Sequence, residues 1–171
     1  MADAEILVAR QDNVVQLRVR GRATNKISPD TKEFCQRCIN SGAKRVIVDF
    51  SDCLAMDSTF MGVLAKVSID GEEKGCEVVF VNISAHLREL LEQLGIDGMF
   101  QFSTEKVNDV DFASLFDAAQ QVDAQRLGRT VLEAHEILIK VDPRNLPKFK
   151  SVVEMLAAEL GSAKKKEGET P

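Results

Sequence analysis

Apolar and polar residues alternate near the start of the chain with the period of two that is typical of a half-buried strand. The alternation covers residues 14–20, from Val15 onward, and ends at Gly21. A shorter, partly apolar segment at residues 5–10 precedes it, and Asp12-Asn13 supplies turn residues between the two. The pattern therefore predicts a β-hairpin at the beginning of the chain.

Two later segments are apolar without alternation. Residues 45–50 and 77–82 are rich in β-branched side chains, which is typical of central strands that helices cover on both faces. Residues 99–102 predict a short edge strand. Residues 51–56 follow the first of the apolar runs, and we interpret them as a loop.

Apolar residues at helical spacing lie between these strands and predict three helices, each bounded by cap and stop residues. Their expected bounds are Ser28-Pro29 to Ser41-Gly42, Asp57-Ser58-Thr59 to Gly75, and Ser84 to Gly95. In the first helix we interpret Ser28 as the cap and Pro29 as the first helical residue.

The chain changes character after residue 111. Apolar residues from Leu115 to Val141 follow steps of three, four and one five, which predicts one helix of about thirty residues. Asp142-Pro143 breaks this helix, and residues 147–160 predict another that ends at Gly161. The polar residues 162–171 predict a disordered tail.

The order of elements is therefore β-β-α-β-α-β-α-β-α followed by a further helix. This order predicts an α/β fold, with a mixed sheet of about five strands and helices on its faces. We expect a domain at residues 1–126 and a C-terminal helical hairpin at residues 127–161. The facing apolar stripes of the hairpin predict an ordered pair that mediates a homodimer contact or covers a surface of the domain.

Composition narrows the classes of function. A net charge of −5 at pH 7 argues against a dedicated nucleic-acid binder, since neutralising phosphates requires a basic surface. No apolar run reaches the roughly eighteen residues that a membrane span requires, and the acidic N-terminus lacks the features of a secretory signal. We expect a cytoplasmic protein.

The four cysteines are Cys35, Cys38, Cys53 and Cys76. Cys35 and Cys38 form a CxxC pair within a predicted helix, but the second pair of a four-ligand zinc site is missing. We therefore expect reduced, buried or neutral thiols rather than a redox or metal site. No cofactor is expected.

Residues 48–62 carry a recognisable motif. A strand ending in Val48-Asp49-Phe50 is followed by a short segment, then by Asp57-Ser58-Thr59 and Gly62 at the start of a helix. Together with the order of elements, this segment resembles the switch motif of STAS-domain proteins of the anti-sigma-factor-antagonist type. In that motif Gly-Leu-Gly follows the serine pair, and here Phe60 and Met61 replace its first two residues. The resemblance covers residues 5–126.

The resemblance implies a bacterial partner-switching phosphoprotein that catalyses nothing itself. Its unphosphorylated form would bind and sequester an anti-sigma factor with a histidine-kinase-like ATPase fold. That partner would phosphorylate Ser58 and so abolish binding, and a metal-dependent serine phosphatase of the PP2C type would reverse the modification. Thr59 is a less favoured acceptor. The implied partner-binding residues are Asp52, Asp57, Ser58, Thr59, Phe60, Met61 and Gly62.

Physical chemistry is compatible with this hypothesis. A serine at a helix start faces free backbone N–H groups and the positive end of the helix dipole, which favour a phosphate. Asp52 and Asp57 would make the phosphorylated surface strongly negative, so that a partner adapted to a neutral hydroxyl would be repelled. Phe60 is expected either to project as an apolar anchor or to pack inside.

Several alternatives stay open. Asp57 and Ser58 would look the same if they only capped a helix. Asp49, Asp52 and Asp57 resemble in their order the acidic pocket of response-regulator receivers, which would bind a metal. His86 and His135, the only histidines, lie outside any nucleophile motif. The second functional class is a STAS scaffold or dimer module in a signalling pathway without a sigma factor as its output.

Overall fold

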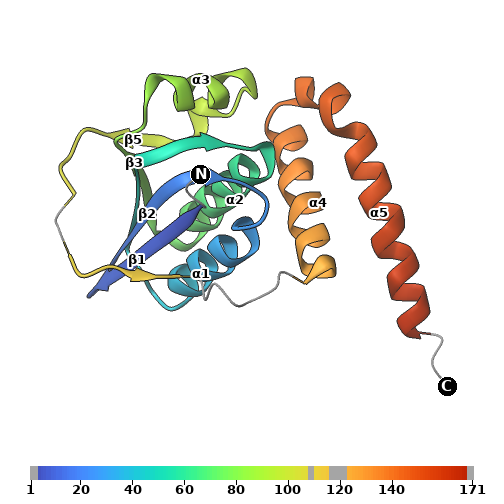
Figure 1. The fold of residues 1–171 in the computed structure, drawn as a ribbon, viewed down its shortest axis with the longest axis horizontal. Coiled ribbons are helices and arrows are strands. Elements are labelled where there is room, and N and C mark those ends of the chain that lie inside the picture. The colour runs from blue at the N-terminus through green and yellow to red at the C-terminus, as the bar shows by residue number, and fades with distance from the viewer. Residues whose placement is uncertain (1–3, 108–109, 116–122, 169–171) are drawn as a thin grey trace.

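The computed structural model of the chain describes residues 4–107, 110–115 and 123–168. Its centre is a mixed sheet in the order β5-β4-β3-β2-β1-β6, drawn in Figure 1. β1 pairs antiparallel with β2 and β6, whereas β2 to β5 are mutually parallel. The strands are β1 (Glu5–Gln11), β2 (Val14–Ala23), β3 (Arg45–Met56), β4 (Glu77–Val81), β5 (Gln101–Ser103) and β6 (Ala113–Ser114).

Helices connect and cover these strands. They are α1 (Ser28–Asn40), α2 (Ser58–Lys74), α3 (Ala85–Gln93), α4 (Ala124–Val141) and α5 (Leu146–Gly168), with short 3-10 turns η1 (Asp97–Met99) and η2 (Pro143–Asn145). Figure 1 shows α1 and α2 against the sheet, α4 alongside α2, and α5 outermost beyond α4. The predicted α/β fold is confirmed.

The segment predicted as a loop at residues 51–56 is instead the second half of β3. It pairs with β2, where Gly21 lies opposite Cys53 and Ala23 lies opposite Met56, with irregular register on the way. The prediction was wrong because it judged residues 51–56 by their own composition. The long partner strand β2 supplies hydrogen bonds that keep this polar segment extended.

Two smaller expectations also need correction. Ser28 is the first residue of α1 rather than its cap, and its hydroxyl donates to the Thr24 carbonyl oxygen at 2.9 Å. Strand β6 was not expected, because two residues that pair with Leu7 and Val8 carry too little pattern to predict a strand.

The core between the sheet and the helices includes residues of α4. Ala134 and Leu138 are 2% and 0% exposed and belong to the same apolar cluster as Val48 and Phe50. Helix α4 therefore forms part of the STAS-like domain, and the boundary predicted at residues 126/127 falls inside its first turn. Leu115, where the long helix was expected to begin, lies next to β6; residues 116–122 are outside the described residues.

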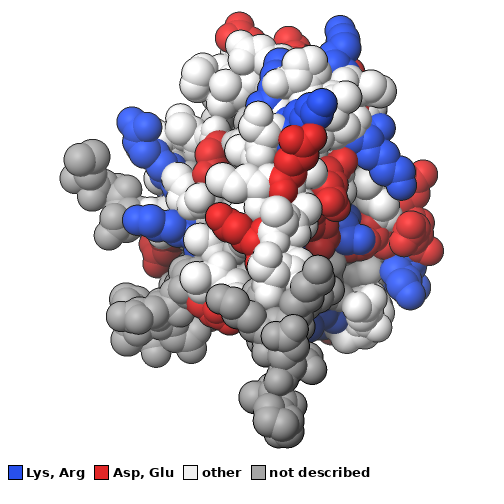
Figure 2. Space-filling model, turned by 90° about the vertical axis from the view of Figure 1, so that its right-hand side faces the viewer, with Lys and Arg blue, Asp and Glu red and all other residues white. Residues whose placement is uncertain are grey.

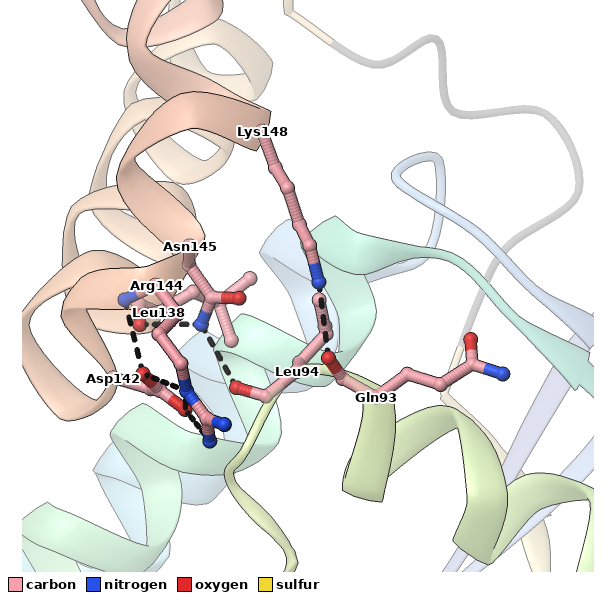
Figure 3. Close-up of polar contacts among 7 residues, drawn as sticks. All are labelled: Gln93, Leu94, Leu138, Asp142, Arg144, Asn145 and Lys148. Atoms are coloured by element: carbon pink, nitrogen blue, oxygen red, sulfur yellow. Dashed lines mark hydrogen bonds and ion pairs between the residues drawn. The ribbon is translucent and has the colours of Figure 1, made fainter.

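Hydrogen bonds connect the segment between α4 and α5, which we call the joint, to the end of α3 (Figure 3). Asn145 is 1% exposed, and its Nδ2 donates to the carbonyl oxygens of Leu94 and Leu138, each at 2.8 Å. Lys148 Nζ donates to the Gln93 carbonyl oxygen at 3.0 Å. The predicted break at Asp142-Pro143 is confirmed, and it is anchored rather than free.

Helix α5 continues through Gly161 to Gly168, so the tail expected to be disordered from residue 162 is helical over most of its length. Gly161 does not adopt the left-handed conformation that ends many helices. The alanine, lysine and glutamate residues that follow are good helix formers, and their propensity outweighs the polar composition on which the prediction rested. Residues 169–171 are outside the described residues.

Candidate functional site

Asp57 joins two segments at the beginning of α2. As the N-cap residue it accepts a hydrogen bond at Oδ1 from the Phe60 backbone N–H, at 2.8 Å. Its other oxygen, Oδ2, accepts from the Asn25 N–H at 2.7 Å. Asp57 therefore caps α2, and it also holds the turn between β2 and α1 against the start of α2.

Ser58 is the first residue of α2 and is half-buried. Its Oγ lies 2.9 Å from Nε2 of His135, which comes from α4, seventy-seven residues later in the chain. His135 is 4% exposed. Its Nδ1 lies 2.6 Å from the Val131 carbonyl oxygen, and its ring meets the Phe149 ring edge to face at a centroid distance of 4.7 Å.

A glycine lets α4 approach this closely. A Cβ placed on Gly62 would lie 2.5 Å from the Ala134 carbonyl oxygen and 2.6 Å from the Ala134 Cβ. Ser58 and Gly62 are four residues apart, so they share one face of α2. The close contact at Gly62 holds the neighbouring His135 against Ser58.

The next three predicted partner-binding residues point inward. Thr59, Phe60 and Met61 are 4%, 0% and 6% exposed, and α4 covers Gly62. In this conformation Thr59, Phe60 and Met61 are buried and Gly62 is covered, so their direct contact with a partner stays a prediction. Of the two expectations for Phe60, the structure shows the one in which it packs inside, because this side of the first turn of α2 lies over the sheet.

Asp52 also differs from its expected role. Its side chain is half-exposed and pairs with Arg20 at 3.4 Å on the neighbouring strand. Because β3 is extended from Asp52 to Met56, roughly 13 Å separates Asp52 from the end of the strand. Asp57 is thus the acidic neighbour of Ser58, whereas Asp52 lies farther along the strand.

Two exposed residues that the motif did not indicate lie on segments that flank the start of α2. Leu54, on β3 four residues before Ser58, is 64% exposed. Lys26 is exposed on the turn that Asp57 holds through Asn25. These side chains are open to solvent, whereas Thr59, Phe60 and Met61 are buried.

The acidic residues do not form a metal site. Asp49 is buried, and its carboxylate accepts hydrogen bonds from Arg18, Asn82 and the Ser51 N–H at 2.9–3.0 Å. Among the described residues, no three His, Cys, Asp or Glu side chains come together in a way that could hold a metal ion. This arrangement gives no support to the receiver-like alternative.

All four cysteines are buried, free thiols. Burial raises the pKa of the Cys35 thiol, and the nearby Cys38 and Cys76 raise it further. Burial also raises the pKa of Cys53 to about 11, against hydrogen bonds from the backbone that lower it. Such thiols are protonated at neutral pH and therefore poor nucleophiles, which agrees with the expectation of buried, neutral cysteines.

The contact of His135 with Ser58 is a feature that the sequence interpretation missed. The apolar periodicity of α4 does predict an inward face, since Thr130, Ala134 and Leu138 recur every four residues and are all buried. His135 adjoins that face. Nothing in a single sequence shows that this face meets the start of α2, because that contact depends on how distant helices pack.

Comparisons with known proteins agree with the fold. The sequence model of the family described as "Mlab, STAS domain" matches residues 6–102, a segment that contains Ser58 and ends before His135. No curated protein matches the chain. In the described part of the chain, no helix is long and apolar enough to cross a membrane.

Solved structures of similar fold include the anti-sigma factor antagonist SpoIIAA in its unphosphorylated form. It is 19% identical, with 60% of this chain and 90% of that chain covered and a TM-score of 0.51. The phosphorylated form of SpoIIAA from Bacillus is 20% identical, with coverages of 60% and 93% and a TM-score of 0.50. A Thermotoga maritima protein described as a candidate anti-sigma factor antagonist is 18% identical, with coverages of 57% and 85% and a TM-score of 0.52.

Proposed function

This chain belongs to the STAS domain family, and from that premise we propose that it is a bacterial anti-sigma factor antagonist regulated at Ser58. Its unphosphorylated form binds and sequesters an anti-sigma factor that is also a serine kinase with a histidine-kinase-like ATPase fold. Phosphorylation of Ser58 abolishes this binding, and a PP2C-type phosphatase restores it. The protein acts in the cytoplasm as a binding partner rather than as an enzyme.

The observation that carries this proposal is the position of Ser58. It is the first residue of α2, directly after the capping Asp57, and it is half-buried while Thr59 is buried. Ser58 is thus the hydroxyl of the Asp-Ser-Thr motif that a kinase can reach. SpoIIAA, whose fold is similar, has a solved structure in the phosphorylated form, which supports the proposal by analogy.

Electrostatics supports a switch of this kind. The backbone N–H groups of a helix start stabilise a phosphate, so the fold tolerates the modification. A phosphoserine carries a charge of about −1.5 to −2 at pH 7, and here it would stand beside the carboxylate of Asp57. A partner surface that packs around a neutral hydroxyl would then bury uncompensated negative charge, which is costly.

A pull-down from an extract of the source bacterium tests the proposal, with the wild type, Ser58→Ala and Ser58→Asp as baits. Ser84 also stands at a helix start, where its hydroxyl caps α3, so Ser84→Asp is a matched control. We expect an ATPase-type anti-sigma factor to be retained by every bait except Ser58→Asp. Equal retention by Ser58→Asp, or phosphorylation of Ser58→Ala by the captured kinase, would overturn the assignment of Ser58.

One observation favours the second candidate, a scaffold or dimer module without a sigma factor as its output. Met155 and Leu146 on α5 are 55% and 46% exposed, and a groove of about 400 Å³ between α4 and α5 is lined by Leu127, Val131, Leu156 and Leu160 among others. Figure 2 looks onto this side, where acidic and basic side chains are interspersed among uncharged residues. An apolar groove in such a surface is a candidate contact for a second copy of the chain.

A further inference from the structure

The hydrogen bond between Ser58 and His135 has one direction when the imidazole is neutral. The Val131 carbonyl oxygen can only accept, so His135 Nδ1, 2.6 Å away, donates to it. In a neutral imidazole the other nitrogen, Nε2, is then an acceptor without hydrogen. Ser58 Oγ, 2.9 Å from Nε2, therefore donates its hydroxyl hydrogen to the ring.

The ring is held in this orientation by its surroundings. It is almost completely buried and packs against Phe149 of α5. A turn of the ring by 180° about its bond to Cβ would break the hydrogen bond to Val131. Ser58, Val131 and Phe149 contact the ring, and none of these three groups carries a charge.

We propose that His135 takes up the proton that Ser58 loses on phosphorylation and then binds the phosphate. This inference rests on the proposed function only in taking Ser58 as the phosphate acceptor. It assigns to α4, outside the segment matched by the family, a direct part in the switch.

The step balances within known chemistry. The phosphoryl donor is a nucleoside triphosphate bound to the kinase. The bond from Ser58 Oγ to the γ-phosphorus forms, the bond from that phosphorus to the bridging oxygen breaks, and the nucleoside diphosphate leaves with the electron pair. The hydroxyl proton moves to His135 Nε2, which lies within hydrogen-bond reach of the reacting oxygen.

Phosphorylation reverses the hydrogen-bonding requirement at Nε2. The ester oxygen of a phosphoserine has no hydrogen, and a dianionic phosphate only accepts hydrogen bonds. A bare Nε2 would face phosphate oxygens lone pair to lone pair in a site that excludes most water. An imidazolium instead donates from both nitrogens, to Val131 as before and to a phosphate oxygen through a charge-assisted hydrogen bond.

The location of the site favours this pairing over expulsion of α4. Ser58 is only half-buried, so part of the residue is open to solvent. Helix α4 is fixed by Ala134 and Leu138 in the core and by Asn145 at the joint with α5. The phosphorylated chain therefore keeps α4 in place, with His135 as the counter-charge of the phosphate.

The test uses the full-length chain with phosphoserine built in at position 58 during synthesis, and ¹⁵N-labelled histidine. At neutral pH we expect Nε2 of His135 to give the ¹⁵N signal of a bare nitrogen in the unmodified chain and of an N–H in the phosphorylated chain. His86 is exposed on α3 and serves as the reference in the same spectra. An Nε2 signal that does not change on phosphorylation would overturn the inference.

A second measurement follows the phosphate itself by ³¹P NMR across a pH series, in phosphorylated wild type, His135→Gln and His86→Gln. Glutamine can donate a hydrogen bond but cannot take up a proton, so we expect the titration to shift in His135→Gln and to stay unchanged in His86→Gln. Identical curves for all three chains would contradict the pairing. If His135→Gln does not fold, the ¹⁵N measurement on the wild type decides alone. Because no kinase is used, failure here leaves the proposed function standing. Equal retention of the Ser58→Asp bait in the pull-down would leave the pairing of a Ser58 phosphate with His135 standing, whereas phosphorylation of the Ser58→Ala bait would remove Ser58 as the acceptor and overturn both.

Discussion

Asp49 is a buried carboxylate in the middle of β3, and hydrogen bonds keep it charged. Burial by itself raises the pKa of Asp49, but hydrogen bonds from Asn82, the Ser51 N–H and Arg18 outweigh burial and hold the pKa below its ordinary value. A carboxyl whose pKa is lower in the folded than in the unfolded state stabilises the fold above the unfolded value of about 4. This contribution is lost as the pH falls through the lower pKa of the folded state.

We therefore expect Asp49→Asn to reduce the free energy of unfolding by about 1–3 kcal/mol at pH 7, because it leaves the partly buried Arg18 without its carboxylate. The measurement is urea unfolding of both proteins at pH 7 and near pH 3. The difference in the free energy of unfolding between wild type and variant should be smaller near pH 3, because the wild-type carboxylate protonates as the pH falls. A difference in the free energy of unfolding that is the same at both pH values would show that the charge of Asp49 does not contribute to stability.

We expect Leu54 to contact the partner directly. Leu54→Ala should weaken retention of the anti-sigma factor in the pull-down and shift the free energy of unfolding by less than about 0.5 kcal/mol, because the side chain is largely exposed. Met155→Ala removes a similarly exposed apolar side chain on α5 and should leave retention unchanged. Equal effects of the two substitutions would argue against a contact at Leu54.

Gly62 gives a test of the contact between α2 and α4. Gly62→Ala should destabilise the fold by about 1–3 kcal/mol, because the new methyl group would collide with the Ala134 backbone. Gly161→Ala, in a helix with nothing within 4 Å of the added Cβ, should be neutral or stabilising by up to about 1 kcal/mol. Thermal unfolding and hydrogen exchange in α4 report both effects. If Gly62→Ala has the same stability and the same hydrogen exchange in α4 as the wild type, α4 packs less closely against α2 than described.

Among single residues, the sequence predicts those whose role depends only on neighbours in the chain. Asp57 and Ser58 are recognisable because a cap and a helix start lie within one short motif. The pairing of Ser58 with His135 joins positions seventy-seven residues apart, and no local pattern encodes such a contact. The sequence left open whether Phe60 packs inside, since that depends on which side of α2 meets the sheet.

Among the elements, helix boundaries with capping chemistry were predictable and the extent of strands was not. The start of α2 at Asp57, its end at left-handed Gly75 and the cap of α3 at Ser84 all match the sequence interpretation. The extension of β3 to Met56 depends on pairing with β2, and the persistence of α5 past Gly161 depends on propensity summed over several residues. A local sequence pattern predicts the end of an element least well where a neighbouring strand or the rest of a long helix stabilises the residues at that end.

The joint between α4 and α5 is expected to depend on Asn145. Asn145→Ala would leave the Leu94 carbonyl oxygen without its donor in a buried place, at about 1–3 kcal/mol, whereas the Leu138 carbonyl oxygen would still accept from the Asp142 N–H at 3.1 Å. A loss of this size lowers the melting temperature by several degrees, since about 1 kcal/mol corresponds to roughly 2–4 °C at this size. Lys148→Ala, which removes an exposed hydrogen bond to Gln93, is the control and should have little effect.

For the whole molecule, the sequence predicted an α/β fold with a mixed sheet and helices on its faces, and the structure confirms this fold class. It did not predict that α4 is part of the domain core, because an apolar stripe shows that a helix is covered without showing by what. The role of the C-terminal pair in self-association stays a prediction.

Light scattering tests that role on the full-length chain. If the groove between α4 and α5 binds a second copy, the wild type should have the mass of a dimer. Leu160→Glu, at the edge of the groove, should have the mass of a monomer, because it would bury a charge in an apolar contact. Lys150→Glu, on an exposed part of α5, is the control. A wild type that is monomeric at all concentrations would exclude the groove as a dimer contact.

The long separation between Ser58 and His135 has a consequence for the newly made chain. At about 5–20 residues per second, the ribosome adds His135 roughly 4–15 s after Ser58. Over that interval the nascent domain lacks Ala134 and Leu138 from its core, and the Ser58 hydroxyl has no imidazole beside it. A kinase that met the chain during translation would find the serine in a different state from the one it has in the finished protein.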